Sequence, residues 1–220
     1  MTDNSFLSVY YEDQNYHKFN AVSELSTALL IIDLQNTYTK LGKTADTIRF
    51  SQFSQRLEKI VIPNTKKLLF EFRKRNMQII YCRIASHLKN GNDRSLSQKL
   101  EGLNSTLLFK DDYDSQIIDS IAPQSEEIVL TKTTDSALTG TNLRLLLNNL
   151  SIKTVVCAGI FTDQCVSSTV RSLSDESFDV IVPHDATAAG TMELHNAELT
   201  ILNHIYCTVM SSDKIIDLLK

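Results

Sequence analysis

Short apolar runs alternate with segments of helical periodicity along most of this chain. Six of these runs are rich in Ile, Val and Leu and are nearly continuous in apolar residues. They are TALLIIDLQN from Thr27, QIIYCRI from Gln78, EEIVLTK from Glu126, IKTVVCAGI from Ile152, FDVIVP from Phe178 and IYCTVM from Ile205. Continuous apolar runs of this length are typical of parallel strands that are covered on both faces.

The segments between these runs have the spacing of amphipathic helices. The helix near Pro63 is expected to bury Leu68, Leu69 and Phe72, and a second helix is indicated by the helical spacing of Leu143, Leu146, Leu147 and Leu150. The helix after Thr162 is expected to bury Val166, Val170 and Leu173, and the one after Gly190 Leu194, Ala197 and Ile201, before a last helix from Ser212. Alternation of strands and helices predicts an α/β protein with three layers, α/β/α. We expect a doubly wound, six-stranded parallel sheet in the order 3-2-1-4-5-6.

Two regions lie outside this alternation. Residues 1–25 are predicted to be an N-terminal extension, and residues 26–220 a single domain. The extension carries Phe6, Leu7, Tyr10 and Tyr11, which a monomer would have to hide or leave exposed; together with the family resemblance given below, they favour a homo-oligomer, a dimer or a tetramer. The polar stretch from Ser86 to Asp114 is an excursion that could form the wall of a pocket.

Composition excludes several classes of protein. The chain has 220 residues, 42% of them hydrophobic, and a formal net charge of -4 without a basic run, so nucleic acid is not an expected partner. No apolar stretch has the length of a membrane span, and the N-terminus has no signal-peptide pattern, so we expect no membrane association and a cytoplasmic protein. The four cysteines contain no C-x-x-C pair and show no zinc spacing.

Ionisable residues follow three of the predicted strands. Asp33 comes directly after ALLII, Lys132 directly after EEIVLT, and Cys165 a few residues after the strand that ends near Gly159. Ligands of open α/β sheets bind beyond the carboxyl ends of the strands, so these three side chains are expected to converge there. Each has a structural alternative, since Asp33 can cap a turn and Lys132 can be a solvated edge residue.

Cys165 differs from the other three cysteines, which lie inside strand patterns as small buried hydrophobes. With Thr162 as the N-cap, Cys165 lies in the first turn of a helix, where free backbone amides and the helix dipole are expected to lower a thiol pKa. The same amides can hold a developing oxyanion. The alternative is that Cys165 only packs its helix against the sheet.

Four motifs together resemble the isochorismatase-like cysteine hydrolases. TALLIIDLQN resembles the opening strand of that superfamily, and KTTDSALTGTNLRLLL from Lys132 its Lys, Ser-Ala and Thr-x-Leu segment. AGIFTDQCVSST from Ala158 resembles its nucleophile loop, the most specific of the four, and HDATAA from His184 its Asp-Ala segment. The motifs have the order and spacing of the family over roughly residues 25–210.

This resemblance implies a catalytic triad of Asp33, Lys132 and Cys165. In the family, the Asp accepts the thiol proton, the Lys stabilises the ionised arrangement, and the thiolate forms an acyl-enzyme. It also implies an oxyanion hole made by the backbone amides of Phe161 and Cys165, and a cis peptide between Ile160 and Phe161.

A retained cysteine favours hydrolysis of a C–N bond in a small amide, ureido or carbamoyl compound. No Asp-x-His metal motif follows the second strand, as it does in nicotinamidases, so we expect no metal and no cofactor. The alternatives are a vinyl-ether hydrolase of the isochorismatase type and a non-catalytic binding or scaffold protein. A dinucleotide-binding oxidoreductase is disfavoured because LQNTYTK stands where G-x-G-x-x-G would follow the first strand. The candidate residues for a small-molecule substrate are Gln35, Asn36, Tyr38, Arg83 and His87.

Overall fold

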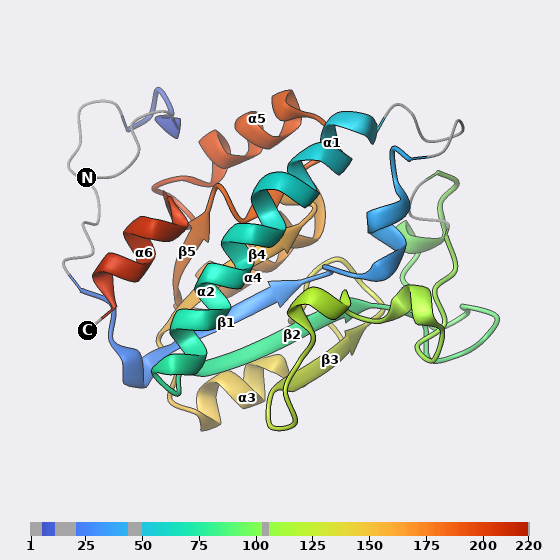
Figure 1. Ribbon diagram of the computed structural model, residues 1–220, viewed down its shortest axis with the longest axis horizontal. Coiled ribbons are helices and arrows are strands. Elements are labelled where there is room, and N and C mark those ends of the chain that lie inside the picture. Colours follow the sequence, from blue (N-terminus) through green and yellow to red (C-terminus); the bar gives the residue numbers. More distant parts are fainter. Residues whose placement is uncertain (1–5, 12–20, 44–49, 103–105, 220) are drawn as a thin grey trace.

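The computed structural model describes residues 6–11, 21–43, 50–102 and 106–219. A twisted parallel sheet lies at the centre, with helices on both of its faces (Figure 1). This arrangement is the predicted three-layer α/β/α fold.

The sheet has seven strands, all parallel, in the order β3-β2-β1-β4-β5-β7, and the seventh, β6, pairs with β4. The strands are β1 (Thr27–Ile32), β2 (Gln78–Ile84), β3 (Ile128–Lys132), β4 (Thr154–Ile160), β5 (Asp179–Pro183), β6 (Thr187–Ala188) and β7 (Thr208–Met210). The predicted fold class and strand order are therefore confirmed, with β7 as the sixth predicted strand. The prediction lacked β6, because two residues are too few to form a recognisable apolar run.

Helices connect the strands in the expected places. They are α1 (Ser51–Arg56), α2 (Ile62–Lys74), α3 (Leu143–Asn149), α4 (Ser167–Asp175), α5 (Met192–Leu202) and α6 (Ser212–Leu218). Single π-helical turns, Leu57–Val61 and Thr162–Val166, precede α2 and α4. Pro63 closely follows the π-helical turn that joins α1 to α2, inside one continuous helical run, so its missing N–H removes one hydrogen bond of that run.

Two hydrophobic cores lie on opposite faces of the sheet. Successive strand residues point to opposite faces, so in β1 Leu29 and Ile31 enter one core while Leu30 and Ile32 enter the other. Helices α1, α2 and α6 cover the first face, and α3, α4 and α5 cover the second. All six residues of β1 are buried, which explains why this strand reads as a continuous apolar run.

The structure corrects the predicted inner face of α5. Leu194 is 48% exposed and Ile201 is 52% exposed, whereas the buried residues of this helix are His195, Leu199 and Leu202. Apolar residues occur on both sides of α5, and the polar His195 is buried because its ring has hydrogen-bond partners inside the protein. The spacing of the apolar residues alone therefore predicted the wrong buried face for α5.

The described part of the predicted N-terminal extension packs on its own chain. Phe6 is buried against the core on the α5 face, and its carbonyl accepts a hydrogen bond of 2.9 Å from the Asn203 side chain. Tyr10 remains exposed. Phe6 is therefore covered within one chain, and the other residues of the extension, 1–5 and 12–20, lie outside the described residues.

The tightest backbone approach in the sheet is between β4 and β1. Gly159 has a φ of 124°, and a Cβ added there would lie 2.0 Å from the carbonyl oxygen of Ile32. Only glycine combines a favourable positive φ with the absence of a Cβ atom, and this position needs both. This contact brings the end of β4 close to the end of β1, just before the residues that form the candidate site.

Candidate active site

Asp33 is the first residue after β1. Its backbone N–H donates to the carbonyl of Cys82 at 2.8 Å, which extends the β1–β2 ladder by one bond. Its φ is 54°, a left-handed conformation that Asp adopts more readily than most residues. The chain therefore turns sharply at Asp33, whose carboxylate is 2% exposed at the carboxyl edge of the sheet.

Lys132 is the last residue of β3 and one of the largest fully buried side chains. Its Nζ donates to three acceptors: Asp33 Oδ2 at 2.8 Å, the carbonyl of Thr134 at 3.1 Å and Cys165 Sγ at 3.2 Å. An ammonium has three donors, so each one is used. Because β2 lies between β1 and β3, only a side chain as long as lysine can bridge from β3 to both partners.

Cys165 lies in the π-helical turn Thr162–Val166, one turn from the end of β4. The carbonyl of Phe161 accepts from the amides of Gln164 at 3.0 Å and Val166 at 3.1 Å, which winds the turn. Phe161, and not Thr162, is the N-cap, so the expected cap was placed one residue too late. The peptide bond between Ile160 and Phe161 is cis, as the resemblance implied.

The electrostatics of the three side chains favour a neutral thiol beside an ion pair. Burial raises the pKa of Asp33, while Lys132 acts to lower it. Burial opposes the charge on Lys132, but Asp33 and Cys165 outweigh it and raise the lysine pKa. Burial, and next to it the Asp33 carboxylate, raises the pKa of Cys165 well above its usual value. The lowering of the thiol pKa that the helix position suggested is therefore wrong for the free protein, because burial and a nearby carboxylate outweigh the lysine.

The two oxygens of Asp33 have different surroundings. Oδ2 accepts from Lys132, whereas Oδ1 is buried without a close, well-aligned donor among the described residues. The Cys165 thiol and the backbone of Ile84 also act on the Asp33 carboxylate and favour its charged form. A buried carboxylate oxygen without a partner is costly and therefore uncommon. Here it leaves one acceptor available for a proton.

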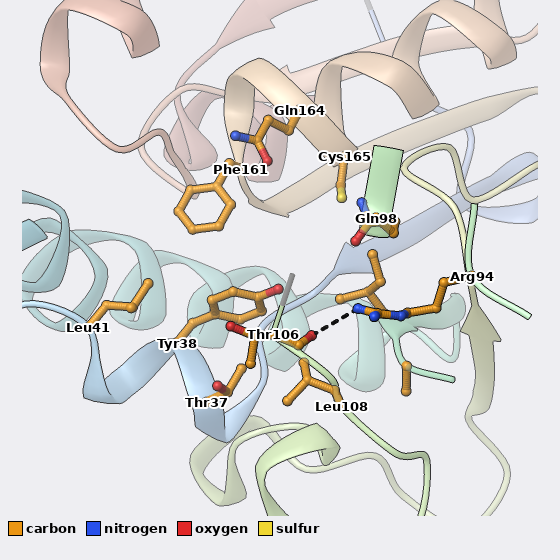
Figure 2. Close-up of a pocket in the computed structure, with 12 residues that line it drawn as sticks. Thr37, Tyr38, Leu41, Arg94, Gln98, Thr106, Leu108, Phe161, Gln164 and Cys165 are labelled. Carbon is orange, nitrogen blue, oxygen red and sulfur yellow. Dashed lines mark hydrogen bonds between the residues drawn. The ribbon is translucent and has the colours of Figure 1, made fainter. Parts of the chain in front are cut away.

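A cavity opens beside the sulfur. Its empty space is about 590 Å³, including the part that is open to solvent. The cavity is lined by Thr37, Tyr38, Leu41, Ile84, Ala85, Arg94, Gln98, Thr106, Leu108, Phe161, Gln164 and Cys165. Figure 2 shows the sulfur of Cys165 at one side of this space, with the rings of Tyr38 and Phe161 close by. Cys82, Cys157 and Cys207 do not line the cavity.

Most of this chain matches a known protein family. The sequence model of the Isochorismatase domain matches residues 27–214, which include all the strands described above. The chain belongs to the isochorismatase family. It is 29% identical over 187 residues to ureidoacrylate amidohydrolase RutB of Acinetobacter baylyi, a match that covers 79% of this chain and 75% of that protein.

Solved structures of isochorismatase-like proteins share the fold. A cysteine hydrolase from Pseudomonas syringae pv. phaseolicola superposes with a TM-score of 0.79 at 20% identity, over 93% of this chain and 97% of that one. N-carbamoylsarcosine amidase from Thermoplasma acidophilum superposes with a TM-score of 0.63 at 24% identity, over 86% and 97%. At these identities, the superpositions establish the fold alone.

In this isochorismatase-family protein, Gln35 and Asn36, which we expected to bind substrate, form hydrogen bonds with backbone groups instead. The Gln35 amide accepts from the N–H of Ile84 and donates to its carbonyl, both at 2.9 Å, and donates to the carbonyl of Ser115 at 2.8 Å. Asn36 donates to the carbonyl of Tyr113 at 3.0 Å. These side chains do not line the cavity, because backbone groups already occupy them.

Arg83 and His87 also lie outside the cavity lining. Arg83 donates to Thr131 Oγ1 at 3.2 Å and to Gln116, which keeps its guanidinium on the outer strands. His87 is exposed on the loop after β2. Tyr38 is the one predicted substrate residue that lines the cavity, and burial, with Asp33 nearby, raises the pKa of its hydroxyl.

Several lining residues were not predicted individually. Arg94, Gln98, Thr106 and Leu108 come from the stretch Ser86–Asp114, which therefore forms a wall of the cavity as expected. Asp135 was also missed, although its Oδ1 lies 3.6 Å from Cys165 Sγ. Its place three residues after Lys132 was the available signal, since the loop after β3 must pass the same edge of the sheet.

A buried network supports the nucleophile loop from behind. His195 on α5 contacts Thr162 Oγ1 through Nδ1 at 2.8 Å and an Arg56 nitrogen through Nε2 at 3.0 Å. Arginine can only donate, so Nε2 is the acceptor and Nδ1–H donates to Thr162. Burial, then Arg56, lowers the pKa of His195 to about 3, which keeps the ring neutral.

Among the described residues, no three His, Cys, Asp or Glu side chains are grouped as a metal site would require. Within the same residues, none of the helices combines the length and the apolar character of a membrane-spanning helix.

Proposed function

We propose that this chain is a cysteine-dependent hydrolase that cleaves the C–N bond of a small amide, ureido or carbamoyl compound. The single observation that carries the proposal is the Lys132 ammonium, which contacts Asp33 at 2.8 Å and Cys165 at 3.2 Å beside a cavity. Ureidoacrylate amidohydrolase and N-carbamoylsarcosine amidase, two of the proteins it resembles, are named for this class of substrate.

In this proposal, Asp33 takes the proton of the Cys165 thiol as the sulfur attacks the substrate carbonyl. Oδ1 of Asp33 receives the proton, since Oδ2 is the oxygen that accepts from Lys132 and the Cys165 thiol acts on the same carboxylate. Lys132 stays protonated and balances the negative charge that moves from the carboxylate to the sulfur. Because the pKa of the Cys165 thiol is raised, the thiol is proposed to lose its proton as the sulfur attacks rather than beforehand.

The tetrahedral intermediate places its oxyanion near the backbone amides of Phe161 and Cys165, both of which line the cavity. When the C–N bond breaks, the proton on Asp33 passes to the departing nitrogen, and a thioester remains on Cys165. Asp33 then takes a proton from water, whose oxygen attacks the thioester carbonyl. The acid product leaves and the thiol is restored.

The test is a screen for product release from small amides, with acetamide, malonamate, N-carbamoylglycine and N-carbamoyl-β-alanine as first probes. We expect ammonia or carbamate release by the wild type, and a loss of roughly 10⁶-fold in kcat for Cys165→Ala, by analogy with other nucleophile removals. Cys157→Ala is the matched control, since Cys157 is buried in β4 and does not line the cavity. Full activity of Cys165→Ala would exclude the mechanism, and inertness toward all such compounds would favour the non-catalytic alternative.

We propose the remaining properties on the same basis. The hydrolase domain comprises residues 26–220, preceded by the extension 1–25, and acts in the cytoplasm on a small molecule without a cofactor. The chain is proposed to form a homo-oligomer, for which the exposed Leu194 and Ile201 of α5 offer apolar surface. Light scattering at micromolar concentration tests this, and a monomer would contradict it.

A further inference from the structure

A second carboxylate lies beside the nucleophile, and the proposed reaction does not use it. Asp135 Oδ1 is 3.6 Å from Cys165 Sγ, on the loop that follows Lys132. Asp33 already serves as proton acceptor and as the ion-pair partner of Lys132. Among the described residues, Asp135 forms no salt bridge with a Lys, Arg or His side chain. It therefore has no role in a structural ion pair.

The Asp135 carboxylate is held in place from the cavity wall. Gln98 donates to Oδ1 at 2.6 Å, and Ser97 donates to Oδ2 at 3.3 Å. Gln98 is itself buried and lines the cavity next to Cys165 (Figure 2). Oδ1 also accepts from the Cys165 thiol at 3.6 Å, so both of its lone pairs are used in the free protein. Neutral donors fix the orientation of the carboxylate, and the lone pair of Oδ1 that faces the sulfur becomes available when the thiol gives up its proton.

Distances place this acceptor within reach of the substrate atom that leaves. Reacting atoms in a near-attack arrangement are about 3–3.5 Å apart, and the C–N bond adds about 1.3 Å. An oxygen 3.6 Å from the sulfur can therefore lie within hydrogen-bond distance of the nitrogen on the attacked carbon.

An ionised carboxylate only accepts hydrogen bonds, so its ligand must carry a donor. An amide or ureido nitrogen has N–H groups, and the departing amine becomes a stronger donor when it is protonated. The oxygen of an ester or a vinyl ether has no hydrogen to donate. A partly buried acceptor beside the sulfur therefore discriminates between these leaving groups, because it loses a hydrogen bond when it faces an oxygen.

We propose that Asp135 is a specificity-determining residue that accepts a hydrogen bond from the leaving nitrogen and selects N–H-bearing leaving groups over oxygen leaving groups. This inference rests on the proposed function and names the substrate class of the same site. It also separates C–N hydrolysis from a vinyl-ether reaction, in which Asp135 would face an oxygen with lone pairs only.

The experiment compares two compounds that share the acyl group and differ in the leaving group: acetamide and methyl acetate. Asp135→Asn should lower the ratio of kcat/KM for amide over ester by about 10- to 100-fold, the range that one charge-assisted hydrogen bond supports. Gln98→Ala should shift the ratio in the same direction by a smaller factor. Asp111→Asn, on an exposed side chain, is the matched control and should leave the ratio unchanged.

Equal losses for amide and ester in Asp135→Asn would overturn the proposal, because the residue would then act on the thiol and not on the leaving group. The iodoacetamide reaction of Cys165, followed against pH, is the second readout. A shift of its profile that matches the loss of turnover would also count against leaving-group recognition. Failure of the wild type on every amide would contradict the proposed function itself, whereas equal losses contradict only this role of Asp135.

Discussion

Lys132 Nζ lies 2.8 Å from Asp33 Oδ2, and both side chains are almost fully buried. Their mutual attraction offsets the cost of removing two charges from water, so each depends on the other. The sulfur of Cys165 completes the set as the third contact of the ammonium within the site. The pair is therefore both a structural element of the core and the charge system of the proposed reaction.

Removal of Lys132 is predicted to destabilise the protein as well as inactivate it. Lys132→Met leaves Asp33 buried without its cation, and the free energy of unfolding should fall by about 3–5 kcal/mol. Urea denaturation at pH 7 measures the loss. The control is Lys67→Met, which breaks the exposed Lys67–Asp213 pair and should cost less than about 1 kcal/mol. Similar losses in the two variants would show that the buried Lys132–Asp33 pair contributes no more to the free energy of unfolding than an exposed pair does.

Alkylation of the native protein is predicted to be confined to Cys165 and to accelerate with alkaline pH. Cys165 borders the cavity, whereas Cys82 and Cys157 are buried inside strands. Burial and Asp33 raise the pKa of Cys165 above its usual value, so the thiolate fraction should still be increasing above pH 9. Mass spectrometry of iodoacetamide-treated protein between pH 6 and 10 tests both points. A plateau below pH 8 would contradict the raised pKa.

Acid sensitivity is predicted to depend on His195. Its pKa is about 3 in the folded protein, against a usual value of 6.5. The unfolded chain therefore binds the proton more readily, so this stabilisation is full above pH 6.5 and is lost as the pH falls toward 3. In His195→Asn, urea midpoints should change less between pH 6.5 and 4 than in the wild type. His87→Asn, on an exposed loop, is the control and should keep the wild-type slope.

Gln35 is predicted to contribute to stability and not to substrate affinity. Gln35→Ala removes both hydrogen bonds to the backbone of Ile84, and the buried groups left behind should cost about 1–3 kcal/mol. Gln164→Ala is the matched comparison, since Gln164 lines the cavity. KM should change in Gln164→Ala, while thermal melting should change in Gln35→Ala. The reverse pattern would return Gln35 to the substrate site.

The sequence was sufficient to predict the sheet and the positions of Asp33, Lys132 and Cys165. Continuous apolar runs identify strands buried on both faces, and in a doubly wound sheet the residues after those strands meet at one edge. The partners of polar side chains were not predictable in this way. Gln35 has the same appearance in a sequence whether its amide binds a substrate or a strand, and only the position of Ile84 decides between them.

The orientation of α5 shows a second limit. Apolar residues recur on more than one side of this helix, so its spacing fits two orientations. The structure buries the side with His195, because Thr162 and Arg56 satisfy both ring nitrogens. Those partners are distant in sequence and come from the nucleophile turn and from α1. A polar residue in the core is thus explained by tertiary contacts that no local pattern contains.

The wall of the cavity is attached to the sheet by main-chain hydrogen bonds rather than by the reactive side chains. Ser86 N–H donates to the carbonyl of Leu108 at 2.8 Å, and Ser95 N–H donates to the carbonyl of Thr133 at 2.9 Å. Backbone anchors of this kind tolerate many side chains. The wall is consequently a replaceable module, unlike Ile117, Ile118 and Ile121 after it, which pack in the core. A segment from a related chain could be transplanted at the same anchors to change which molecules enter the cavity.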